Sequence, residues 1–141
     1  MKKNEVPIWH PISSLPMISS MITGQLNEAK IQYNTLLEVR HKPHILNDEI
    51  VSRIFKLFSE QQEYIPIYSE QLTRWDKEPL SADQQKEIVK LKEQVESWEK
   101  TVAEILILNN EISHGTIDRI LSMSDEELAI KILSGEIPKP K

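Results

Sequence analysis

Residues 81–115 read SADQQKEIVKLKEQVESWEKTVAEILILNNEISHG and decide the fold class of this chain. Ser81 and Gln84 have the spacing of a capping box, in which two side chains satisfy backbone N–H groups at a helix start. Residues of one stripe then recur every three or four positions up to Gly115, a residue type that commonly ends helices. The stripe comprises Ile88, Leu91, Val95, Trp98, Val102, Ile105, Asn109 and Ile112. This pattern predicts one long amphipathic helix between Ser81 and Gly115.

Two further segments have the same helical period. The first is predicted to begin after Ser14, with Pro16 in its first turn, and to run to about His41, because Pro43 disfavours a helical residue before it. The second is predicted to begin at Asn47 and to end near 77–79. Pro66 lies inside this second segment and is expected to kink or break the helix.

Two short helices are predicted after Gly115. Thr116 is expected to cap a helix over Ile117–Met123, and a second capping box at 124–127 is expected to open one over Leu128–Leu133, which Gly135 ends. Short connections between long amphipathic helices indicate an antiparallel up-down bundle. We therefore predict an all-α domain over 1–141, with three long helices and a short C-terminal helical hairpin that folds back over the bundle end. Residues 1–13 are expected to form an extended arm, and residues 136–141 an extended Pro/Lys tail.

Composition excludes several kinds of chemistry. The 141 residues include no cysteine and only three glycines, which lie too far apart for a Gly-rich phosphate loop. The absence of cysteine removes thiol nucleophiles, disulfides and cysteine-based metal sites. The net charge of −5 argues against nucleic acid as a partner, and no apolar run is long enough to cross a membrane. A cytoplasmic protein without a cofactor is the expectation.

The predicted hairpin is too short to cover the whole groove between the long helices. The part left open is expected to expose an apolar patch, and such patches are usually buried by a partner. We predict this patch to be the partner-binding surface, with a second copy of the chain or another protein as the partner. Its residues are Met17, Met21, Tyr64, Tyr68, Trp75 and Trp98.

Three more features concern packing. Residues 54–58 and 105–108 are apolar on more than one helical face, which predicts packing on two sides at that end of the bundle. Gln61 and Asn109 fall on core stripes, where a buried amide can fix register or oligomeric state. Pro66 is predicted to lie level with Gly24, where a missing side chain favours close approach of two helices.

Glu38 with His41, and Glu111 with His114, form two Glu-x-x-His motifs at one end of the bundle. Di-iron carboxylate bundles use such motifs, so a metal-binding enzyme is one alternative function. On a helical wheel, however, these four residues point about 90° or more away from the core stripes, whereas metal ligands in such bundles point inward. Solvent-facing residues at helix ends, without a metal, are therefore the prediction.

A second alternative is a DNA-binding regulator with a degenerate helix-turn-helix near residues 101–122. Residues 107–115 would make its turn too long, and Arg119 is the only basic residue of the candidate reading helix. Acidic residues at 118 and 125–127 would repel phosphates. The sequence thus favours a non-enzymatic interaction or scaffold module that acts as a homodimer.

Overall fold

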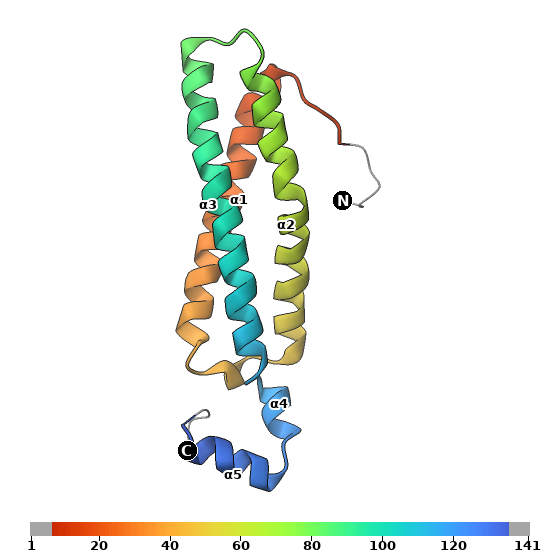
Figure 1. The fold of residues 1–141 in the computed structure, drawn as a ribbon, viewed down its shortest axis with the longest axis vertical. Coiled ribbons are helices and arrows are strands. Elements are labelled where there is room, and N and C mark those ends of the chain that lie inside the picture. The colour runs from red at the N-terminus through yellow and green to blue at the C-terminus, as the bar shows by residue number, and fades with distance from the viewer. Residues whose placement is uncertain (1–6, 136–141) are drawn as a thin grey trace.

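The computed structural model describes residues 7–135 and confirms the all-α class (Figure 1). Two 3-10 turns, at Ile12–Ser14 and Pro43–Ile45, precede α1 and α2. Residues 1–6 of the predicted arm and the predicted tail at 136–141 lie outside the described residues. The α-helices are α1 (Leu15–Val39), α2 (Asp48–Asp76), α3 (Ala82–Ser113), α4 (Ile117–Leu121) and α5 (Asp125–Leu133).

The predicted caps explain where most helices begin. The Asn47 side chain accepts a hydrogen bond from the Ile50 N–H, and Ser81 and Gln84 form the reciprocal capping box before α3. Thr116 accepts a hydrogen bond from the Arg119 N–H and Ser124 accepts one from the Glu127 N–H, so that both cap their helices, but the structure shows only this half of the capping box predicted at 124–127. Ser14 differs, because the 3-10 turn leads directly into α1 and the Ser14 side chain makes no capping bond.

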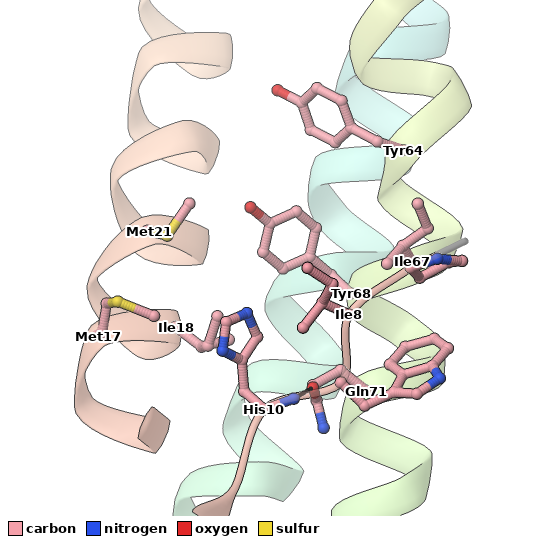
Figure 2. Close-up of a pocket in the computed structure, with 11 residues that line it drawn as sticks. Ile8, His10, Met17, Ile18, Met21, Tyr64, Ile67, Tyr68 and Gln71 are labelled. Carbon is pink, nitrogen blue, oxygen red and sulfur yellow. Dashed lines mark hydrogen bonds between the residues drawn. The ribbon is translucent and has the colours of Figure 1, made fainter. Parts of the chain in front are cut away.

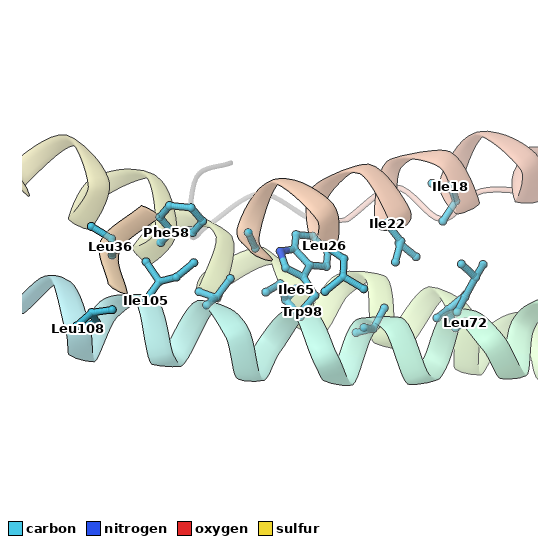
Figure 3. Packing of buried hydrophobic residues seen from close by; sticks show 14 of the residues in the cluster. Ile18, Ile22, Leu26, Leu36, Phe58, Ile65, Leu72, Trp98, Ile105 and Leu108 are labelled. Carbon is cyan, nitrogen blue, oxygen red and sulfur yellow. The ribbon is translucent and has the colours of Figure 1, made fainter. Parts of the chain in front are cut away.

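Helix α3 packs along both other long helices, whereas α1 and α2 have little direct contact with each other. The three helices run antiparallel in chain order (Figure 1). We call the end where α1 and α3 begin the arm end, and the end where α3 finishes the α4 end. Figure 3 shows the core between the helices, with Trp98 close to Leu26 and Ile65. Each of these three side chains is buried.

Helix α2 continues through Pro66 from Asp48 to Asp76, so of the predicted kink or break, the break is wrong. Pro66 and Gln62 both lie on the exposed face of the helix. The carbonyl group of Gln62 loses its usual helical donor at Pro66, and because this face is exposed, water can replace that donor and reduce the cost of an interior proline.

The predicted close approach at Gly24 is also wrong. A Cβ atom added to Gly24 would meet no heavy atom within 4 Å, so this glycine faces open space. Gly115 is the glycine with a close neighbour, because an added Cβ atom would lie 2.6 Å from Pro43 Cγ. The missing side chain therefore matters at the α4 end and not beside Pro66.

The C-terminal helices lie beyond the α4 end and do not fold back over it, which corrects the predicted hairpin arrangement (Figure 1). Helix α4 is held to the start of α2 by three hydrogen bonds. The Ile117 N–H donates to the Leu46 carbonyl at 2.9 Å, and the Asp48 N–H donates to Asp118 Oδ2 at 2.6 Å. The hydroxyl of the buried Thr116 donates to Asp48 Oδ1 at 2.6 Å. These bonds direct α4 along the bundle axis and away from the core.

Packing on two sides at the α4 end is not observed. Phe55 is 59% exposed and Ile107 is 72% exposed, because α4 and α5 project away from the helix faces that they were expected to cover. None of the helices within residues 7–135 has both the length and the apolar character that a membrane span requires.

Candidate functional site

A pocket lies between α1 and α2 at the arm end. It forms there because α3 supports both helices from one side while the opposite side of their junction stays open. The segment Pro7–His10 runs along this opening and forms one wall of the pocket (Figure 2). The pocket has a volume of about 420 Å³ and is lined by Pro7, Ile8, Trp9, His10, Met17, Ile18, Met21, Tyr64, Ile67, Tyr68 and Gln71.

Three contacts attach the arm to the last turns of α2. The backbone N–H of His10 donates to Gln71 Oε1 at 2.7 Å, and Trp75 Nε1 donates to the His10 carbonyl oxygen at 3.0 Å. The guanidinium carbon of Arg74 lies 4.2 Å from the centre of the Trp9 ring, within cation–π range. The arm is thus attached to α2 at Trp9 and His10, and both of these residues also line the pocket.

Aromatic rings form the α2 side of the pocket. Tyr68 lies edge-on to Trp98 at a centroid distance of 5.5 Å, and Tyr64 lies 6.0 Å from Tyr68. Edge-to-face contacts of this kind fix the ring orientations. Trp98 is itself fixed, since its Nε1 donates to the buried Gln61 Oε1 at 2.9 Å. The tyrosine rings of the pocket wall therefore pack against Trp98, whose orientation is fixed by its hydrogen bond in the core.

The two tyrosine hydroxyls point from α2 toward α1, where Met17 and Met21 lie (Figure 2). Burial raises the pKa of Tyr68 above its ordinary value of 10.0. Burial also raises the pKa of Tyr64, and nearby Tyr68 and Glu60 raise it further. Both hydroxyls therefore keep their protons at neutral pH and are available as hydrogen-bond donors.

The structure brings some of the predicted partner-binding residues together. Met21, Tyr64 and Tyr68 all line the pocket, together with Met17. Trp75 and Trp98 were expected on the same uncovered surface, but both indoles are 0% exposed, so that expectation is wrong. Periodicity shows that both tryptophans face inward, and the arm over Trp75 and the packing of α1 over Trp98 then bury them completely.

The arm residues and Gln71 were missed as parts of the site. The sequence marks 7–11 as an extended segment between two prolines, but spacing alone does not say which helices such a segment covers. Gln71 carries a stronger signal, because it lies seven residues after Tyr64 on the same face of α2. A heptad extension from Tyr64 would have identified it.

The two Glu-x-x-His motifs lie on the surface at the α4 end, where Glu38, His41, Glu111 and His114 are all exposed. Glu111 Oε2 forms an ion pair with Arg40 Nε at 3.0 Å. Within residues 7–135, no group of three His, Asp or Glu side chains is placed to hold a metal ion.

The segment of the degenerate helix-turn-helix also differs from expectation. Helix α3 continues to Ser113 and α4 begins at Ile117, so the join is only three residues long. The predicted long join over 107–115 is therefore wrong. Helix α4 has only five residues, however, and Asp118 in its first turn binds the backbone N–H of Asp48.

A second surface with functional potential is the α4 end itself. Helix α5 has no buried residue, and most of the large apolar side chains that are exposed gather at this end. They are Leu37, Ile45, Ile50, Phe55, Leu57 and Ile107 on the bundle, and Leu121, Ile130 and Leu133 on α4 and α5.

No family model, curated protein or solved structure matches this chain.

Proposed function

We propose that this protein is a non-enzymatic interaction module that acts as a homodimer, and that two copies meet through their α4 ends. The observation that carries the proposal is the concentration of exposed apolar side chains there, on all three long helices and on α4 and α5. Burial of such a surface in a partner is the common explanation for a large exposed apolar patch.

Helix α5 supports this proposal most strongly. Ile130 and Leu133 lie three residues apart on one helical face, and Leu133 is 84% exposed. A nine-residue helix gains most of its stability from packing of its apolar face. A second copy supplies the surface against which that face packs.

Charge supports a second copy as the partner. The connection from Arg40 to His44 carries two basic residues and two histidines, whereas the first turn of α5 carries three acidic residues, Asp125–Glu127. A two-fold axis at the α4 end sets the acidic turn of each copy against the basic connection of the other. Such self-complementarity is what an isologous interface requires.

The proposal differs in location from the partner surface predicted around Met21, Tyr64 and Tyr68, because the arm already covers part of that groove. The other parts of the proposal are those expected from the sequence, namely a single bundle domain with a C-terminal helical pair and a location in the cytoplasm. The lack of cysteine fits that compartment.

The test compares a charge at the proposed interface with a charge at the opposite end. Ile130→Glu introduces a carboxylate on α5, and Val89→Glu introduces one at an exposed apolar site near the start of α3. Sedimentation equilibrium should give a dimer dissociation constant at least about tenfold weaker for Ile130→Glu and unchanged for Val89→Glu. Equal dissociation constants for the two variants would overturn the proposed interface.

A further inference from the structure

We propose that the pocket between α1 and α2 binds an uncharged, aromatic small molecule that carries one carbonyl-type hydrogen-bond acceptor. This inference goes beyond the proposed self-association and concerns the opposite end of the bundle. It rests on the size, the charge and the hydrogen-bonding groups of the pocket.

The size fits a compact ligand of two or three rings. The volume of about 420 Å³ lies within the range of about 300–1,000 Å³ that is usual for small-molecule sites. Met17 and Met21 form the α1 side of the pocket. Methionine side chains adapt their shape to a guest, and their sulfur atoms make favourable contacts with aromatic rings.

The charge of the pocket selects an uncharged ligand. None of its lining residues is Asp, Glu, Lys or Arg, and the one histidine of the lining, His10, is solvent-exposed. The neighbouring Arg74 already packs over the Trp9 ring, and Glu60 lies near Tyr64. A charged guest would therefore lose hydration without gaining a partner charge, and that loss is large in an apolar site.

The hydrogen-bonding groups select an acceptor. Tyr64 and Tyr68 direct two hydroxyl groups across the pocket toward α1 (Figure 2). Neither hydroxyl makes a hydrogen bond within the described part of the chain, so both can donate to a ligand. The rings of these tyrosines offer apolar contact area beside the hydroxyls.

The arm completes the site. Ile8 lines the pocket and is nevertheless 82% exposed, so this apolar side chain gains burial when a guest fills the space behind it. The contacts of His10 with Gln71 and Trp75 hold the arm close to α2 while leaving Ile8 beside the cavity.

Fluorescence titration of the full chain with prodan tests the inference, because this dye is an uncharged naphthalene with a ketone oxygen and its emission reports hydrogen bonding at that oxygen. The control ligand has the same ring system with a carboxylate in place of the ketone chain. We expect saturable binding of one prodan per chain, at least about tenfold tighter than binding of the carboxylate. Absence of saturable binding, or tighter binding of the carboxylate, would overturn the inference.

Substitutions in the pocket, compared with one outside it, locate the bound dye. Met21→Trp fills the pocket from α1 and should weaken prodan binding at least about tenfold, whereas Ile31→Trp, at an exposed site on the same helix, should leave it unchanged. Tyr68→Phe keeps the apolar wall but removes one donor, and should shift the emission of bound dye to shorter wavelength. If Met21→Trp fails to fold by circular dichroism, Met17→Trp replaces it. Unchanged binding in the filled variant would place the dye elsewhere and refute the site.

The outcome is independent of the proposed self-association. Prodan binding by a monomer would support the pocket and contradict the homodimer, whereas a dimer that does not bind prodan would do the reverse.

Discussion

Gln61 and Trp98 form a hydrogen-bonded pair in the middle of the core, and both side chains are buried. The indole N–H of Trp98 requires an acceptor, because an unpaired donor in the core keeps its full desolvation cost. Gln61 on α2 supplies that acceptor for α3, so the pair fixes the register between the two helices. The sequence predicted a buried amide at Gln61 from its position on the core stripe, but periodicity could not identify its partner.

Replacement of Gln61 by leucine tests the pair. We expect Gln61→Leu to lower the free energy of unfolding by about 1–3 kcal/mol, because it leaves the Trp98 N–H unpaired. Gln62→Leu, at the exposed neighbouring position, is the control and should change stability by less than about 0.5 kcal/mol. Urea denaturation followed by tryptophan fluorescence measures both. Equal stabilities of Gln61→Leu and the native chain would show that the bond does not contribute.

The two pocket tyrosines make the free energy of unfolding depend on pH in the alkaline range. Their raised pKa values mean that the folded chain holds the phenolic protons more tightly than the unfolded chain does. The resulting stabilisation is fully present below pH 10.0, the ordinary tyrosine pKa, and is lost as the pH rises through the raised values.

We therefore expect the free energy of unfolding to fall above pH 10.0, and to fall less steeply in Tyr68→Phe than in the native chain. Urea denaturation over the alkaline range measures the slopes, and ultraviolet difference absorbance of tyrosinate follows the ionisation directly. Tyr33→Phe, outside the pocket, is the matched control. A Tyr68→Phe slope as steep as that of the native chain would contradict this assignment.

At the scale of single elements, local capping chemistry predicted most helix starts. Asn47, Ser81, Thr116 and Ser124 each precede a helix and accept the expected backbone hydrogen bond. Capping depends on residues within one turn, so the sequence carries the information directly. Pro66 was misjudged because the cost of an interior proline depends on whether the affected carbonyl group faces solvent, which is a tertiary property.

Substitution by alanine is expected to have opposite effects on stability at Gly24 and at Gly115. Gly24→Ala should stabilise the chain by about 0.5–1 kcal/mol, because the site is helical, has open space and gains helix propensity. Gly115→Ala should destabilise it, since the new Cβ atom would lie 2.6 Å from Pro43 Cγ. Thermal unfolding of the two variants measures both changes. A stabilising Gly115→Ala would mean that the connection between α1 and α2 shifts readily at the α4 end.

At the scale of the whole molecule, the inward faces of the long helices could be predicted but their surroundings could not. The stripes identified Trp75 and Trp98 as apolar positions, yet their complete burial depends on the arm and on α1, which are distant in sequence. The direction of α4 likewise depends on Asp48 and Asp118, seventy positions apart. Because the sequence does not reveal such long-range contacts, it predicted a broader groove than the pocket that the structure shows at the arm end.

Self-association of two copies is tested most directly by the absolute mass of the native chain in solution. Light scattering coupled to size exclusion, over about a hundredfold range of concentration, measures it and reveals any dissociation. Self-association requires a mass of twice 16.4 kDa at the upper concentrations. A mass of 16.4 kDa at every concentration would contradict it.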